Sequence, residues 1–438
     1  MKEVKLLVST IVGSVFLICV MSAPAYAVGP YVVTDIGVLS GYGQESQAFS
    51  INSMGQVVGR SESSAGTVHR GAFLWTPTHP NDSDGSKVNL GRFSAGINFD
   101  VTVAHGVNDR GQAAGSSNTA AGTRAFIWTP TSPNGTAGTM TSLVSAFDLR
   151  TAVANGINSH GQAVGYVDGY SSGFYAFLWT PETPNGKTGS AINLGNLPWS
   201  DYSVATAINS VGQVTGIAQS YTEGVPGHPF LWTPNFQNGT EGSMVDLGEL
   251  SDDLDHAWAN GINSFGQVTG SAYSRTIYQR SRAFLWTPSA ANETDGSMVD
   301  LGFLPGGDAA SSAFGVNSNG AVVGDSTVGL FPGQQSQIHH AFVWLPNGTN
   351  QQEGTMFDLN TLLDPATGAG WIIQSARAIN DRGQIVGIGI YDPDGPFGAR
   401  ERVRAVLLTP VPEPSSWALL AASAALSLVV FSRGRMLL

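Results

Sequence analysis

The chain has 438 residues, of which 42% are hydrophobic and only 12% are charged, with 55 glycines and 22 prolines. This composition is typical of many short strands joined by turns. The net charge of −12 argues against nucleic acid and anionic membrane surfaces as partners.

Residues 1–27 have the pattern of a secretory signal peptide. Lys2 and Lys5 form a short basic region, residues 6–21 are apolar, and Ala25 and Ala27 fit a small-x-small cleavage site. The single cysteine lies inside this segment, so the mature chain contains no disulfide or thiol chemistry. We therefore expect an exported protein whose stability comes from packing.

Residues 28–410 contain one motif set repeated seven times. Each copy starts with two strands joined by an Asn-x-x-Gly turn, in which Asn bonds its own backbone and Gly takes positive φ. The turns are Asn52/Gly55, Asn108/Gly111, Asn158/Gly161, Asn209/Gly212, Asn263/Gly266, Asn317/Gly320 and Asn380/Gly383. A third strand follows, with aromatic residues and a final proline: 72–77, 125–130, 176–181, 230–234, 283–288 and 341–346, with a degraded copy at 405–410. We expect the recurring Trp of this strand to pack between repeats rather than to form an exposed binding ring.

A fourth strand with the pattern Asp/Asn-Leu-Gly-x-Leu is expected at Asn89, Asn193, Asp246, Asp300 and Asp358, and residues 141–144 have lost this pattern. A further copy, at residues 35–39, lies upstream of all the others. When a closed ring of repeats is cut inside one repeat, one strand of that repeat lies at the opposite end of the chain from the others. We therefore predict that the N-terminal strand pairs into the last repeat.

These features predict an all-β protein, a seven-bladed β-propeller built from four-stranded repeats of about 50 residues. Such a unit cannot bury its faces alone and has to stack on copies of itself. A β-helix is the main alternative, but its repeats are usually shorter and need no orphan strand. No helical periodicity, P-loop, dinucleotide fingerprint or nucleophile elbow is present.

Antiparallel strand order places the Asn-x-x-Gly turns and the 3–4 loops at one end of the ring. We call this end the repetitive face. The 2–3 loops and the connections between repeats lie at the other end and differ between copies, and we call this end the variable face. Because function on a rigid scaffold concentrates in variable loops, the variable face is the candidate binding surface.

Aromatic residues among small polar residues on the variable face are suited to stacking on sugar rings, unless the loops bury them. The candidates are Tyr170, Phe174, Tyr221, Tyr273, Tyr278, Phe331, Tyr391 and Phe397. Asp252, Asp253 and Asp255 form the densest acidic cluster, but three acids in one loop specify neither a Ca²⁺ site nor a catalytic pair. No metal-ligand spacing emerges among the histidines. No catalytic residue, metal or cofactor is therefore predicted.

Residues 411–438 contain Pro412, Glu413 and Pro414, then an apolar run from 418 to 431, then Arg433 and Arg435. About fifteen apolar residues are few for a membrane span, which needs about 20. A plain membrane anchor is the alternative reading. The Pro-Glu-Pro motif before such a segment resembles the PEP-CTERM sorting signal. The resemblance implies export in a Gram-negative bacterium, a transient inner-membrane stage, and an exosortase-type enzyme that removes the tail.

The repeats also resemble extracellular repeats named for a His-Ala-Phe (HAF) triplet, which stands here at His340-Ala341-Phe342. This resemblance covers nearly all of residues 31–410 and implies exported repeat architecture without a defined activity. We therefore expect a non-enzymatic protein of the cell surface or extracellular matrix that binds polysaccharide or envelope components. The alternatives are a glycan-active hydrolase or lyase, for which fold alone is weak support, and a purely structural surface protein.

Overall fold

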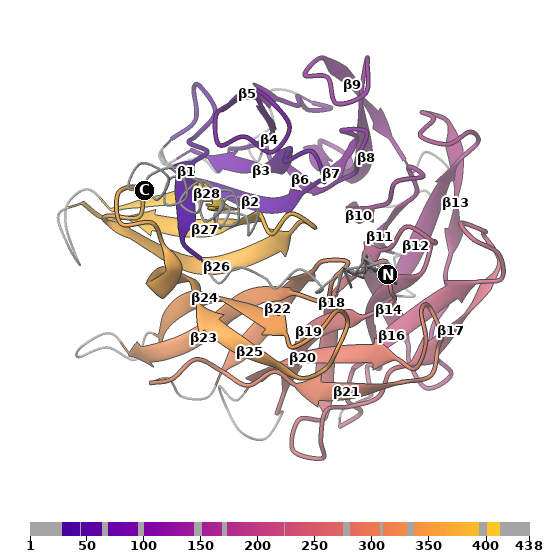
Figure 1. Cartoon of the computed structure of the whole chain (residues 1–438). Helices are drawn as coiled ribbons and strands as arrows, with labels where there is room; N and C mark the ends of the chain where they lie inside the picture. Colours follow the sequence, from indigo (N-terminus) through magenta and orange to yellow (C-terminus); the bar gives the residue numbers. More distant parts are fainter. Residues whose placement is uncertain are drawn as a thin grey trace, which may run out of the picture.

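The structure is a computed structural model. It describes residues 29–43, 45–63, 69–94, 100–143, 151–168, 173–222, 224–274, 281–306, 310–330, 337–393 and 401–411. The described residues form seven four-stranded antiparallel sheets, arranged as the blades of a propeller around a central channel (Figure 1). Among the described residues, no helix has the length and apolar character that a membrane crossing requires.

The strands follow each other along the chain, blade by blade. Blade 1 has β2 (Glu45–Ile51), β3 (Val57–Glu62), β4 (Arg70–Pro77) and β5 (Gly85–Asn89), and blade 2 has β6 (Thr102–Val107), β7 (Ala113–Thr119), β8 (Gly122–Pro130) and β9 (Gly138–Ser142). Blade 3 has β10 (Ala152–Ile157), β11 (Ala163–Asp168), β12 (Phe174–Pro181) and β13 (Gly189–Asn193), and blade 4 has β14 (Tyr202–Ile208), β15 (Val214–Gln219), β16 (His228–Pro234) and β17 (Gly242–Asp246). Blade 5 has β18 (His256–Ile262), β19 (Val268–Tyr273), β20 (Ser281–Pro288) and β21 (Gly296–Asp300), and blade 6 has β22 (Ser311–Val316), β23 (Val322–Leu330), β24 (Gln337–Pro346) and β25 (Gly354–Asp358).

Blade 7 closes the ring with strands from both ends of the chain. It contains β26 (Trp371–Ile379), β27 (Ile385–Tyr391) and β28 (Arg402–Pro410), with β1 (Tyr31–Asp35) as its outer strand, and a short 3₁₀ helix, η1 (Leu359–Leu362), precedes it. β1 is antiparallel to β28, with Tyr31 opposite Pro410 and Asp35 opposite Val406. The seven-bladed fold and its closure by the N-terminal strand are therefore confirmed.

The fourth strands lie a few residues earlier than the sequence pattern predicts. β5, β13, β17, β21 and β25 end at the Asp or Asn of the motif. The following Leu is buried next to the preceding strand, as at Leu90, and in the first four of these strands the next residue is a Gly with positive φ, as at Gly91, whereas Asn360 follows Leu359 after β25. In Asn89-Leu90-Gly91, the Asn89 Oδ1 accepts the Gly91 N–H at 2.8 Å, so the motif is a strand-ending turn. β9 also forms without the motif, since its backbone pairs with β8.

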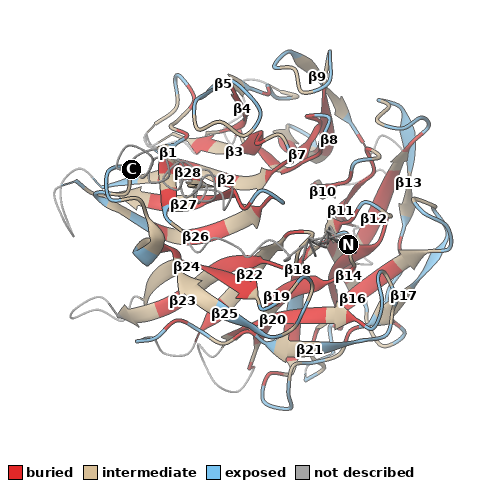
Figure 2. Cartoon of the chain, in the orientation of Figure 1, coloured by how far each residue is buried: buried red, intermediate tan, exposed pale blue. Residues whose placement is uncertain are grey.

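The hydrophobic core is divided among the interfaces between blades (Figure 2). Phe177 and Trp179 on β12 pack with Ile127 of blade 2, while Leu178 of the same strand packs with Phe230 of blade 4. Alternate residues of a strand face opposite sides, so one strand joins two interfaces. The six Trp residues of the third strands are only 2–4% exposed, which confirms that they are packing residues.

Candidate functional site

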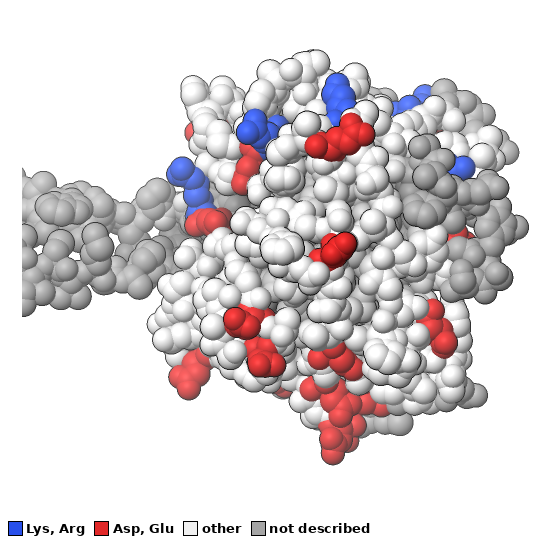
Figure 3. Space-filling view, turned by 90° about the vertical axis from the view of Figure 1, so that its right-hand side faces the viewer, with Lys and Arg blue, Asp and Glu red and all other residues white. Residues whose placement is uncertain are grey.

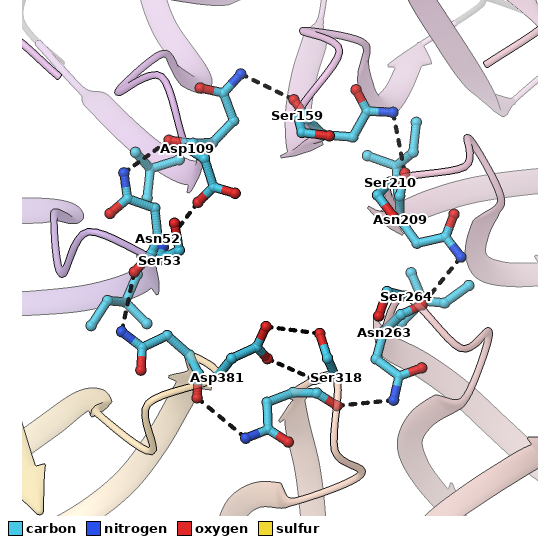
Figure 4. A pocket seen from close by; sticks show the side chains of 18 of the residues that line it. Asn52, Ser53, Asp109, Ser159, Asn209, Ser210, Asn263, Ser264, Ser318 and Asp381 are labelled. Atoms are coloured by element: carbon cyan, nitrogen blue, oxygen red, sulfur yellow. Dashed lines mark hydrogen bonds between the residues drawn. The ribbon is translucent and has the colours of Figure 1, made fainter. Parts of the chain in front are cut away.

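The seven turn asparagines form a closed ring of hydrogen bonds at the repetitive mouth of the channel (Figure 4). Each Nδ2 donates to the backbone carbonyl of the corresponding Asn in the next blade, at 2.9–3.2 Å, and Asn380 completes the circle by donating to Asn52. Each Oδ1 accepts a backbone N–H of its own turn two residues on, as Asn52 does from Met54 at 3.1 Å. These side chains are therefore scaffold groups that join neighbouring blades.

A second row of residues lines the same mouth, around a cavity of about 290 Å³. It consists of Ser53, Asp109, Ser159, Ser210, Ser264, Ser318 and Asp381. Both carboxylates already accept hydrogen bonds from the preceding blade, Asp109 from the Ser53 N–H at 2.9 Å and Asp381 from the Ser318 N–H at 2.8 Å. Among the described residues, no group of three or more His, Cys, Asp or Glu could hold a metal ion.

A buried glutamine in each of six blades extends the scaffold network outward. Gln56 Nε2 donates to Thr76 Oγ1 at 3.0 Å and to the backbone carbonyl of Asn134 in the next blade at 3.1 Å. Asn134 has a φ of 59°, and its counterparts in the other 3–4 loops also have positive φ. Asn81 is one of these counterparts, so residues 81–85 form a turn like the other copies.

Blade 6 has Ala321 and Leu345 where the other blades have this Gln and Thr. The glutamine of blade 6 would point toward the 3–4 loop of blade 7. Blade 7 has no such loop, because its third and fourth strands, β28 and β1, belong to opposite ends of the chain. The blade that lacks the Gln and Thr is therefore the one that precedes blade 7, where the two ends of the chain meet.

Two of the predicted aromatic residues come together on the variable face between blades 3 and 4. Tyr221 is 62% exposed and Phe174 is 38% exposed. Both rings contact Tyr202, with ring centroids 4.9 Å apart for Tyr221 and 6.4 Å apart for Phe174. Phe174 also meets Tyr166 edge-on at 5.4 Å. We call Tyr166, Phe174, Tyr202 and Tyr221 the aromatic patch.

Tyr273 and Tyr391, the other two predicted aromatics that the structure describes, do not join this patch. Tyr273 stacks on His256 with centroids 4.4 Å apart, and Tyr391 stacks on Trp371 at 5.0 Å, each within its own blade. Tyr170, Tyr278, Phe331 and Phe397 lie outside the described residues. The patch also includes two rings outside the predicted set, Tyr166 within β11 and Tyr202 at the start of β14, because the prediction considered loop residues.

Asp201 borders the aromatic patch and is itself exposed. Its Oδ2 accepts the Ser220 hydroxyl at 2.6 Å and the Tyr221 backbone N–H at 2.7 Å. These hydrogen bonds lower the pKa of Asp201, so its carboxylate is ionised at neutral pH. The carboxylate also fixes the backbone that carries the most exposed ring of the patch.

The predicted acidic cluster lies in the tight turn before β18. Asp252 and Asp253 are exposed, Asp255 is half-buried, and Leu254 between them is buried. Figure 3 shows the side of the ring that carries β13 and β17, where acidic side chains are spread over the surface.

Basic side chains at the start of four third strands pair with the Asp that ends the fourth strand of the same blade. The pairs are His228–Asp246 (2.9 Å), Arg282–Asp300 (3.2 Å), His340–Asp358 (2.7 Å) and Arg404–Asp35 (3.4 Å). The hydrogen bond to Asp246 raises the pKa of His228 despite its burial. The His of the His-Ala-Phe triplet is therefore explained by its hydrogen bond to Asp358 within the blade.

A cleft of about 600 Å³ lies on the variable face between blades 1 and 2. Tyr42, His69, Arg70 and Arg92 line it, together with Asp100. Both arginines are already paired, Arg70 with Glu62 at 2.9 Å and Arg92 with Asp100. The cleft therefore offers no unpaired arginine to a ligand.

No site inside the channel was predicted from the sequence. A second cavity, of about 310 Å³, is lined by the inner strands of all seven blades. One residue in each strand at this level differs between blades, within a segment that is otherwise repeated. That variation is the sequence signal that could have identified the site.

The signal-cleavage residues Ala25 and Ala27 and the sorting residues Pro412, Glu413, Pro414, Arg433 and Arg435 lie outside the described residues. No family model matches the chain, and no curated protein matches it. Among solved structures, one of the matches is a GH62 hydrolase in complex with xylotriose. The alignment covers 86% of this chain and 96% of the hydrolase chain. The TM-score of that alignment is 0.29 and the sequence identity is 9%, so no argument is drawn from it.

Proposed function

We propose that this protein is an exported, non-enzymatic propeller that binds polysaccharide through the aromatic patch on its variable face. The observation that carries the proposal is the exposure of Tyr221 and Phe174 beside Tyr202. Most large apolar side chains of the described residues are buried between blades, so an exposed group of rings is an exception that indicates a partner.

The chemistry of the patch favours a sugar as that partner. Aromatic rings offer flat apolar faces to the C–H faces of sugar rings, and tyrosine adds a hydroxyl at the edge. The carboxylate of Asp201 lies beside Tyr221 and accepts hydrogen bonds, which sugar hydroxyls can donate. Gly173, with a φ of 76°, lies directly under the Tyr221 hydroxyl, so the ring rests on backbone and cannot collapse inward.

The test is retention of the purified protein on a panel of neutral and acidic polysaccharides, measured by affinity electrophoresis. Tyr221→Ala and Phe174→Ala should each weaken binding about tenfold, which corresponds to about 1.4 kcal/mol. Phe236→Ala is the matched control, because Phe236 is 81% exposed in blade 4 but lies in a 3–4 loop of the repetitive face. Equal losses for Phe236→Ala and Tyr221→Ala, or no retention of the wild-type protein, would refute the proposal.

The same polysaccharides decide between binding and catalysis. Incubation with the protein should leave their chain length unchanged. Release of reducing ends or unsaturated sugars would replace the binding proposal with a hydrolase or lyase. An Asp252/Asp253/Asp255 triple Ala variant would then show whether those carboxylates carry the activity.

Export and tail removal form a separate part of the proposal, supported by the signal-like residues 1–27 and the Pro-Glu-Pro motif at 412–414. The proposed partner is an exosortase-type enzyme, and the proposed location is the cell surface or extracellular matrix. Intact-mass measurement on the protein from its host should show a chain that starts near Val28 and lacks the apolar tail. A mature chain that keeps residues 418–431 would instead indicate a membrane anchor.

A further inference from the structure

The inner strand of every blade carries one variable position at the same level of the channel. Each strand ends in the segment Ala-x-small-Ile/Val-Asn, where "small" is Gly, Ala or Ser. The strand pairing is shifted by a β-bulge at position x in every blade, as between Ala154 and Gly156. The seven residues at x all line the cavity of about 310 Å³: Phe49, His105, Asn155, Thr206, Asn260, Phe314 and Arg377. We call them the channel ring.

One side of the channel ring is formed by neutral polar groups. Asn155 Nδ2 donates to the Ala205 carbonyl at 2.8 Å, and Asn260 Nδ2 donates to the Ala313 carbonyl at 2.8 Å. Thr206 Oγ1 lies 2.9 Å from the Ala259 carbonyl. Each Nδ2 carries a second hydrogen, and each Oδ1 can accept, so both amides keep hydrogen-bonding capacity after bonding the next blade.

The other side is aromatic and carries one cation. The guanidinium carbon of Arg377 lies 4.1 Å from the centroid of the Phe314 ring. The Phe49 and His105 rings lie next to it around the channel, with centroids 5.8 Å apart. Burial, together with the nearby charge of Arg60, lowers the pKa of His105 to about 4, so this histidine is neutral at neutral pH.

Arg377 has no ion-pair partner among the described residues. Its Nε is buried without a hydrogen-bond acceptor, and burial is the main cause that lowers the pKa of its guanidinium. Asp325 is the carboxylate that acts on Arg377 electrostatically, but the two do not form a salt bridge. A cation that is desolvated without pairing is unfavourable, and an anion in the cavity would compensate it.

We propose that the channel ring binds a single sugar acid, with its carboxylate on Arg377 and its hydroxyls on Asn155, Thr206 and Asn260. Small-molecule sites in proteins have volumes of about 300–1,000 Å³, so this cavity suits one ring-sized molecule. One guanidinium neutralises one carboxylate and matches its planar geometry with two parallel hydrogen bonds. A phosphate dianion would keep an excess negative charge in the cavity, which favours a carboxylate.

Between the channel ring and the repetitive face, the channel is lined by residues of a different chemical type. A girdle of Ile and Val, including Ile51 and Ile208, separates the ring from the mouth that carries Asp109 and Asp381. Carboxylates at that mouth repel an anion, so the mouth and the channel ring select opposite charges. The site is also separate from the aromatic patch, and the inference does not depend on the proposed function.

The experiment is calorimetric titration of the purified full chain with glucuronate, galacturonate, glucose and inorganic phosphate. A uronate should bind at least tenfold more tightly than glucose or phosphate. Arg377→Gln should reduce uronate binding at least tenfold, and Arg377→Lys should reduce it less. Arg382→Gln is the matched control, since Arg382 is exposed in the turn of the same blade, and it should bind like the wild type.

Thermal unfolding of the same variants checks that they are folded. Arg377→Gln and Arg377→Lys should each unfold in one cooperative transition like the wild type, and Arg377→Gln should lose the stabilisation by uronate. Uronate binding that is lost in Tyr221→Ala and kept in Arg377→Gln would place the sugar acid on the aromatic patch and would overturn the proposal. Equal uronate affinity in the wild type, Arg377→Lys and Arg377→Gln, or no uronate binding by the wild type, would overturn the proposal.

Discussion

Replacing Asn209 by Ala tests whether the Asn ring holds neighbouring blades together. The side chain makes two partly exposed hydrogen bonds, with the Val211 N–H at 3.2 Å and Asn292 Oδ1 at 3.3 Å. It makes three more in buried surroundings: Oδ1 accepts the Gln213 N–H at 2.9 Å, and Nδ2 donates to Gln213 Oε1 at 3.0 Å and to the Asn263 carbonyl at 3.1 Å. At about 1 kcal/mol each, their loss should lower the free energy of unfolding by about 3 kcal/mol.

Urea unfolding followed by Trp fluorescence measures this change, because the third-strand Trp residues are buried between blades. Ser210→Ala is the control, since Ser210 is the exposed neighbour in the same turn, and its effect should stay below about 0.5 kcal/mol. A loss below 1 kcal/mol for Asn209→Ala would show that water replaces these bonds and that the ring does not stabilise the fold.

Three further predictions concern pH, closure and packing. Because the pKa of His105 is about 4 in the folded state, against 6.5 for the unperturbed group, the unfolded chain binds more protons between these values. Stability should therefore fall by about 2–3 kcal/mol as pH drops from 7 to 4, and His105→Gln should remove this part of the pH dependence in urea titrations. Val33→Asp places a charge in the core of the closing blade and should destabilise by more than about 3 kcal/mol in the same assay, whereas Thr34→Asp on the opposite strand face should change stability little. Gly189→Ala brings a Cβ within 2.6 Å of both the Thr180 backbone oxygen, which is the nearer atom, and the Trp179 ring, and should lower the melting temperature, whereas Gly329→Ala meets no atom within 4 Å and should not.

Each of these three predictions has an outcome that would contradict it. Parallel pH profiles for the wild type and His105→Gln would assign the acid sensitivity to other groups, and His228 cannot supply it because its raised pKa acts in the opposite direction. Equal stability of Val33→Asp and Thr34→Asp would mean that the N-terminal strand does not close the ring. Equal melting of Gly189→Ala and Gly329→Ala would mean that the Trp packing relaxes easily.

The architecture was accessible from the sequence because its determinants are local and repeated. An Asn that bonds its own turn recurs in all seven copies, and a Trp that packs between blades recurs in six, with Leu408 in its place in blade 7. The fourth strand was placed too late because its most visible residues, such as Asn89 and Gly91, form the turn that ends it. The strand itself has no fixed side chains beyond its first Gly, and backbone pairing alone defines it in β9.

The candidate sites were harder to predict because they depend on contacts between blades. Phe174 of blade 3 meets Tyr202 only where blades 3 and 4 adjoin, and Tyr221 then contacts Tyr202 within blade 4. The channel ring is hard to recognise for a different reason. A single variable residue inside a regular repeat looks like ordinary sequence divergence between copies. Only the ring geometry shows that Phe314 and Arg377 share a cavity with five other such residues.

The closing blade brings the two ends of the described propeller together. The Val411 N–H donates to the Pro30 carbonyl at 2.9 Å, so the chain enters and leaves the ring at one point, where the missing 3–4 loop of blade 7 would be. That point is on the repetitive face. Under the proposal that residues 412–438 hold the chain on a membrane before they are removed, the Asn-lined mouth would face the lipid headgroups. The variable face, with the aromatic patch, would then point into the surrounding medium.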